Sequence, residues 1–78
     1  MNIQIQVAHE SDKSWGPSQF GPCVVTTSSM DAADQLAPFV APSDLPKVRK
    51  VWAQAAATDD QSEIDLGCSL TLMARPYR

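Results

Sequence analysis

The clearest pattern in the chain is an alternation of apolar and polar residues between positions 63 and 74. The even-numbered positions are apolar, and most of the odd-numbered positions between them are polar. The apolar members are Ile64, Leu66, Cys68, Leu70, Leu72 and Ala74. Because side chains alternate between the two faces of a strand, this pattern predicts one long strand with one buried face. Gly67 marks a candidate bulge or close backbone approach within it.

A second alternation lies at the N-terminus. Ile3, Ile5 and Val7 are apolar, whereas Gln4 and Gln6 between them are polar. This period of two predicts a strand with an apolar face in the core and a polar face in water. The pattern is lost from residue 8 to residue 22, a stretch rich in Ser, Gly and Pro that is typical of a loop.

Residues 23–27 predict a second short strand, because β-branched side chains are enriched there and a proline precedes them. A helix capped by Ser28 or Ser29 is expected next. It should end or kink near Ala37, because Pro38 lacks an N–H and its ring clashes with the preceding turn. The positions expected to face the core are Met30, Ala33, Leu36, Ala37 and Val40.

A second helix is expected to begin at Ser43 or Asp44, with Pro46 in its first turn, where the missing N–H is harmless. The break at residues 58–61 ends it. Its expected apolar stripe consists of Leu45, Val48, Val51, Trp52, Ala55 and Ala56.

The element order is therefore strand, strand, helix, helix, strand. It predicts an α+β, two-layer domain in which a three-stranded, mainly antiparallel sheet carries two helices on one face. The last strand is expected antiparallel to the second; in an alternative order, the first strand lies in the middle and runs parallel to the last. Residues 1–78 are expected to form a single small globular domain.

The chain is acidic, with six Lys and Arg against nine Asp and Glu and a formal net charge of −3. No segment has the roughly 18 consecutive apolar residues of a membrane span, and the first residues lack the pattern of a secretory signal. A cytoplasmic location is therefore expected, with Cys23 and Cys68 as free, structural thiols inside apolar strands; a disulfide between them is the alternative.

Two aromatic residues in the loop are candidate partner-binding residues. The sequence repeats an aromatic-Gly-Pro motif at residues 15–17 and again at residues 20–22. Glycine and proline would hold Trp15 and Phe20 as stiff anchors, of the kind that dominates protein interfaces. The alternative is that both rings fold back over the open end of a small core.

Four carboxylates before and within the predicted last strand are the other candidate partner-binding residues: Asp59, Asp60, Glu63 and Asp65. Such a cluster could meet a basic surface on a partner and speed encounter. A solvated turn without a role is the alternative. Calcium binding is not expected, because the loop glycine and the twelve-residue ligand frame are missing.

Other chemistry has little support. The second helix carries a small basic patch of Lys47, Arg49 and Lys50. The whole chain has only six basic residues against nine acidic ones, so its electrostatic attraction for nucleic-acid phosphates is weak. His9 is the only histidine, so catalysis by a Ser-His or Cys-His pair would depend on it, and a zinc site of two His and two Cys is excluded. No cofactor, metal or enzymatic activity is expected.

The leading hypothesis is a non-enzymatic interaction module that occludes a larger protein or nucleoprotein complex with a basic surface, without binding nucleic acid or membrane directly. Phage-encoded inhibitors of host defence, including anti-CRISPR proteins, exemplify this class of small acidic protein. One alternative is a structural or assembly protein that self-associates through the last strand, and the chain could be a monomer or a homodimer. The other is a small enzyme subunit that uses His9 or a cysteine.

Overall fold

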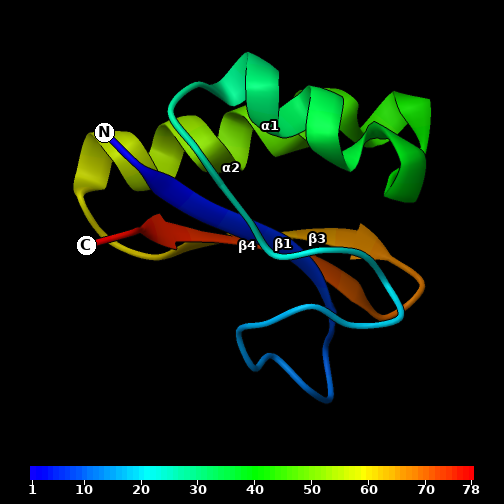
Figure 1. Cartoon of the computed structure of the whole chain (residues 1–78). Coiled ribbons are helices and arrows are strands. Elements are labelled where there is room, and N and C mark those ends of the chain that lie inside the picture. The colour runs from blue at the N-terminus through cyan, green and yellow to red at the C-terminus, as the bar shows by residue number, and fades with distance from the viewer.

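The computed structural model describes all 78 residues (Figure 1). It has two α-helices and an antiparallel sheet, as predicted for an α+β protein, but the sheet has four strands rather than three. The strands are β1 (Ile3–His9), β2 (Val24–Thr26), β3 (Ser62–Gly67) and β4 (Leu70–Pro76). The α-helices are α1 (Ser29–Leu36) and α2 (Leu45–Thr58), and single 3₁₀ turns at Ala37–Phe39 and Pro42–Asp44 lie between them.

The extra strand arises because the predicted long strand is a hairpin. The chain reverses at Cys68 and Ser69, whose φ angles are 54° and 64°, after Gly67 at 81°. Two central residues with positive φ match the twist of the flanking strands, which is why such turns are favoured in two-residue hairpins. The usual residues there are Asn and Gly, and neither stands at position 68 or 69, so the turn carried no sequence signature.

The alternation continues through the turn because β3 contains one extra residue. Ile64 pairs with Leu72, but after Asp65 the register shifts by one, and Gly67 pairs with Leu70. Directly paired residues share a face of a sheet. The inserted Leu66 therefore keeps the even-numbered residues of both strands on one face, as in a single strand. The exception is Cys68, which is exposed, so its predicted place on the buried face is wrong.

The order of the sheet is β2-β1-β4-β3, with every neighbouring pair antiparallel. The expectation that the last strand pairs with the second is wrong. The alternative correctly places the first strand in the middle, but its partner is antiparallel rather than parallel. The hairpin explains the difference: β3 runs in the same direction as β1, and the turn reverses β4 before it pairs with β1.

Helix α1 begins and ends as its residues dictate. The Ser28 Oγ accepts a hydrogen bond from the Asp31 backbone N–H at 3.1 Å and caps the first turn. The helix ends at Leu36, two residues before Pro38, as expected. The predicted core face is partly wrong, because Ala32 and Leu36 are the buried positions and Met30 is 60% exposed.

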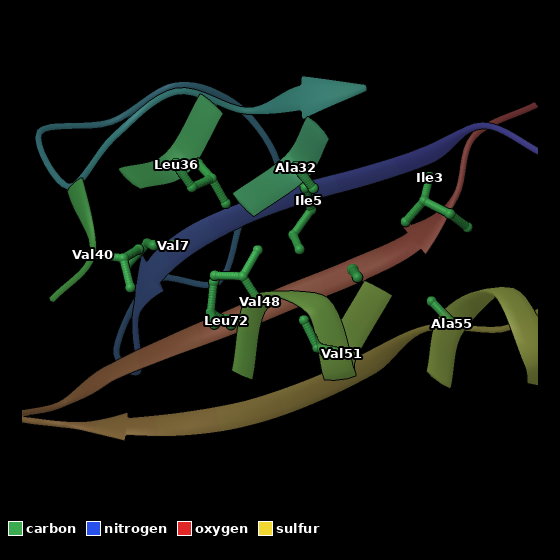
Figure 2. Close-up of a cluster of buried hydrophobic side chains, with 11 residues drawn as sticks. Ile3, Ile5, Val7, Ala32, Leu36, Val40, Val48, Val51, Ala55 and Leu72 are labelled. Carbon is green, nitrogen blue, oxygen red and sulfur yellow. The ribbon is translucent and has the colours of Figure 1, made fainter. Parts of the chain in front are cut away.

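Helix α2 buries the predicted stripe. Val48, Val51 and Ala55 are fully buried, and Leu45, Trp52 and Ala56 pack half-buried beside them. Both helices lie on the same side of the sheet (Figure 1). Their buried side chains meet those of β1 and β4 in one core (Figure 2). At its edge, the Trp52 Nε1–H donates to the Thr26 Oγ1 at 3.0 Å and ties α2 to β2.

The face of the sheet turned away from the helices is also covered. Gln6 pairs with Met73, and Ala8 pairs with Thr71, and all four side chains are buried on this face. The expected exposure of Gln6 is therefore wrong, since its side chain is only 2% exposed. The cover is the loop of residues 10–22, most of which lies on the opposite side of the sheet from the helices (Figure 1), while its end returns to Phe39 at Gly21. The fold therefore contains, besides the sheet and the helices on one face, a loop that covers the other face of the sheet.

The two cysteines are not disulfide-bonded. The prediction that both lie inside apolar strands is wrong: Cys23 is half-buried directly before β2, and Cys68 lies exposed in the hairpin turn. Neither helix is long and apolar enough to cross a membrane.

The hairpin turn gives a first prediction. Residues other than glycine are strained at positive φ, and Asn tolerates it better than Cys or Ser. The double variant Cys68→Asn, Ser69→Gly should therefore raise the free energy of unfolding by about 1 kcal/mol. In a domain of this size, that gain raises the melting temperature by about 4–8 °C. Thermal unfolding followed by circular dichroism measures it. The control Cys68→Ser, which keeps the strain, should melt with the wild type; a double variant that melts no higher than this control would contradict the account.

Candidate functional site

The loop of residues 10–22 is held to the sheet by one buried side chain. The Gln6 Nε2 donates to the Ser14 carbonyl oxygen at 2.7 Å, and the Gln6 Oε1 accepts from the Gly16 N–H at 2.8 Å. The amide thus pairs with the loop backbone as a neighbouring strand would. A backbone bond from the Glu10 N–H to the Ser69 carbonyl at 2.8 Å ties the start of the loop to the β3–β4 turn. The loop is therefore anchored at both of these places.

Local hydrogen bonds fix the shape of the loop. The Asp12 Oδ1 accepts from the Ser14 N–H at 3.3 Å and from the Ser14 Oγ at 2.7 Å. The backbones of Ser18 and Gly21 exchange two hydrogen bonds, of 3.0 and 3.1 Å. These contacts close two small turns, so the loop is an ordered element with its own internal bonding.

The two aromatic-Gly-Pro motifs have one backbone conformation in common. Gly16 and Gly21 have φ angles of 143° and 141°, which only glycine adopts readily. At Gly21 an added Cβ would also lie 3.1 Å from the Phe39 Cγ, so the Phe39 ring would have to move by a few tenths of an ångström. In each motif the glycine lets the chain turn directly after the aromatic residue.

The predicted anchors Trp15 and Phe20 are both half-buried. The Arg75 guanidinium lies 4.2 Å from the centre of the Trp15 ring, and its Nε donates to the Gln4 Oε1 at 2.8 Å. Phe20 stacks on His9 with ring centres 5.9 Å apart and packs against the core. Each ring therefore combines a structural contact with an accessible part, and their role in partner binding stays a prediction.

The structure places two of the four predicted carboxylates, Asp59 and Asp60, directly after α2 and the other two, Glu63 and Asp65, on the edge strand β3. Asp59 is the left-handed C-cap of α2 and pairs with Arg78, and the Asp60 Oδ1 accepts from the Gln61 N–H at 2.7 Å. Asp65 accepts from the Gly67 N–H at 3.0 Å. No group of three His, Cys, Asp or Glu side chains is placed to hold a metal ion.

Glu63 links the edge strand β3 to the loop through an ion pair with Lys13. Its Oε1 lies 2.9 Å from the Lys13 Nζ, and its Oε2 accepts from the Gln61 Nε2 at 3.0 Å. The hydrogen bond from Lys13 is the main reason that the pKa of Glu63 is lowered, and the Gln61 bond and the charge of Lys13 add to it against an opposing effect of burial. The sequence predicted neither the Lys13–Glu63 ion pair nor the contact between the loop and β3.

The net charge of the protein lies outside its helical segment. Residues 29–58 contain three aspartates and three cations, so this segment is neutral. The remaining six carboxylates and three cations, on the loop and the strands and at the chain ends, carry the entire −3. The Lys47 Nζ also pairs with Asp44 at 3.1 Å, which weakens the basic patch on α2 further.

A pocket of about 150 Å³ opens between the loop and the sheet. The rings of His9, Trp15 and Phe20 line it together with polar groups. The polar lining residues are Gln6, Asp12, Ser14 and Ser18, and the others are Ala8, Gly16 and Pro17. The sequence singled out the three rings but missed Gln6, Asp12 and Ser14, because their roles depend on the path of the loop. The only available signal was a serine two residues after an aspartate, which is typical of a turn.

The apolar half of the predicted last strand does not lie at an edge of the sheet. β4 is interior, and the edges are β2 and β3. Glu63 and Asp65 are exposed on β3, and charged side chains on an edge strand oppose pairing with another copy. The edge position on which the self-association alternative was based is therefore present in β3 only, and the alternative stays a prediction.

Comparison of the chain with protein-family models, with curated proteins and with solved structures finds no match.

The Gln6 amide can be tested by Gln6→Met, which keeps the length of the side chain and removes both hydrogen bonds. The Ser14 carbonyl and the Gly16 N–H then lose their partners, at a cost of about 1–3 kcal/mol. Urea unfolding at pH 7 measures the free energy. The control Gln19→Met, at an exposed position of the same loop, should change it by less than about 0.5 kcal/mol. Equal stability of the two variants would show that the amide does not hold the loop.

The Lys13–Glu63 pair predicts a pH dependence. Because the folded protein lowers the pKa of Glu63, the stability this group adds is complete above its unfolded pKa and is lost as the pH falls through the folded pKa. Lys13→Met should therefore reduce the fall in stability between pH 7 and pH 3, by no more than about 1 kcal/mol for so exposed a pair. Urea unfolding at both pH values measures this difference. Lys50→Met, at an exposed residue without an ion pair, should leave it unchanged; the same fall in the wild type and Lys13→Met would contradict the assignment.

Proposed function

We propose that this protein is a non-enzymatic interaction module that occludes a basic surface of a larger protein or nucleoprotein partner. The observation that carries the proposal is the coincidence of two features on one face of the sheet. The ordered loop holds the half-buried Trp15 there, beside Arg75, and the odd-numbered side chains Glu63 and Asp65 of β3 lie on that same face. Rigid aromatic anchors with complementary charge are the combination that protein interfaces use for affinity and for fast encounter.

The size of the protein agrees with this mode of action. Its accessible surface totals 4331 Å², so a standard interface would cover about a fifth of it. A standard interface buries about 800 Å² on each partner. One face can therefore supply a complete interface, and the helical segment, with no net charge, would remain turned away from the partner.

Within this class, we propose an inhibitor of a host defence complex, encoded by a phage and resembling anti-CRISPR proteins in its action. Carboxylates on one face can compete for cations that otherwise contact nucleic-acid phosphates. The support is the acidic face and the small size, and the target is a basic nucleic-acid channel. The unpaired thiols are compatible with a cytoplasmic site of action.

The proposal is tested by adding the purified protein to a panel of reconstituted CRISPR effector complexes and measuring target-DNA binding. The wild type should reduce DNA binding by at least one complex. Trp15→Ala and the double variant Glu63→Lys, Asp65→Lys should each weaken this inhibition about tenfold or more, since both change the proposed contact surface.

The matched control is Asp31→Lys, Asp34→Lys, which makes the same charge change at exposed positions of α1. It should inhibit as the wild type does, and circular dichroism should show every variant folded. No inhibition of any complex would overturn the anti-CRISPR proposal. Inhibition equal to that of the wild type by folded Trp15→Ala and by the folded Glu63, Asp65 double variant would overturn the assignment of the surface.

A further inference from the structure

The pocket beneath the loop has the composition of a site for an organic cation. Its lining contains neither lysine nor arginine, and its one carboxylate belongs to Asp12. Hydrogen bonds from the Ser14 side chain, and then from the Ser14 backbone, lower the pKa of Asp12, so the carboxylate is charged at neutral pH. Only the Oδ1 is used in these bonds, which leaves the Oδ2 without a partner in the chain.

The aromatic lining favours the same kind of ligand. A cation over the face of an aromatic ring is attracted by the ring quadrupole, and a tryptophan ring is the strongest of these partners. Arg75 already lies over one face of the Trp15 ring at 4.2 Å, so a ligand has to use the other face or the edge of this ring. The remaining surface of Trp15 and of the stacked His9–Phe20 pair, beside the Asp12 carboxylate, provides both dispersion and charge for a planar cation.

The volume limits how much of a ligand can enter. Sites for drug-sized molecules are typically about 300–1,000 Å³, and this pocket has about 150 Å³. It can admit one side chain of a partner but not a whole cofactor. Because Gln6 and the turns of the loop fix its walls, little ordering is needed on binding.

We propose that this pocket receives the guanidinium group of one arginine side chain of the partner, with Asp12 as the countercharge and the aromatic rings as the walls. This inference rests on the proposed function and adds the chemistry by which the basic surface is recognised. Arginine fits better than lysine, since its planar group can stack on a ring and donate to a carboxylate oxygen at the same time.

The probe is a short blocked peptide, acetyl-Gly-Arg-Gly-amide, titrated into the ¹⁵N-labelled protein at pH 7. The two tryptophan indole N–H signals report on opposite sides of the molecule. The Trp15 signal should shift on addition of the peptide, and the Trp52 signal, whose indole is bonded to Thr26, should stay in place. The dissociation constant is expected in the millimolar range, since a single side chain makes few contacts.

Two substitutions and two further peptides sharpen the test. Asp12→Asn keeps an Oδ1 acceptor for Ser14 but removes the charge, and should weaken binding by about threefold to tenfold. The control Asp34→Asn makes the same charge change at an exposed site on α1 and should bind as the wild type does. The citrulline peptide, which is neutral but similar in shape, and the lysine peptide should both bind more weakly than the arginine peptide.

No shift of the Trp15 signal, equal binding of the citrulline peptide, or no effect of Asp12→Asn would overturn the proposal. Equal binding of the lysine peptide would overturn the assignment to arginine. The titration contains no partner protein, so its failure leaves the proposed occlusion standing. Conversely, a failure of the effector panel together with a positive titration would overturn only the proposed function.

Discussion

The side-chain amide of Gln6 is the contact on which the second face of the sheet depends. It is buried, and both of its hydrogen-bonding groups are used by the backbone of the loop. A buried amide without partners would cost several kcal/mol, so the loop and the glutamine each satisfy a requirement of the other. The same contact gives the loop a fixed position, and it therefore determines where Trp15 and the pocket lie.

The two faces of the sheet differ in how they are stabilised. Toward the helices, apolar side chains from β1, β4, α1 and α2 form one continuous core (Figure 2). Toward the loop, polar contacts are prominent: an amide paired with backbone, a cation on an aromatic ring and an ion pair. The net charge is carried outside the helical segment. The helices therefore stabilise the core, whereas the loop and the strands carry the proposed partner-binding surface.

The features that burial alone dictates could be predicted from the sequence. These include the apolar face of β1, the stripe of α2, the end of α1 before Pro38 and the mixed α+β composition. The hairpin could not be predicted, because the inserted Leu66 preserves the alternation and neither Asn nor Gly marks the turn at Cys68 and Ser69. Without that turn, the order of the strands could not be derived either. The burial of Gln6 was hidden because a glutamine between apolar residues is normally exposed, and its partners are eight and ten residues away.

The central claim is that residues 10–22 form a preorganised surface, held by Gln6, and native-state hydrogen exchange at the Gly16 N–H tests it most directly. This proton is donated to the Gln6 Oε1, whereas the backbone N–H of Gln19, exposed in the same loop, has no hydrogen-bond acceptor. The account predicts that the Gly16 amide exchanges at least about a hundredfold more slowly than an unprotected amide, because the loop must open before exchange. Exchange of the Gly16 amide at the rate of an unprotected amide would contradict it, since the loop would then be open in solution.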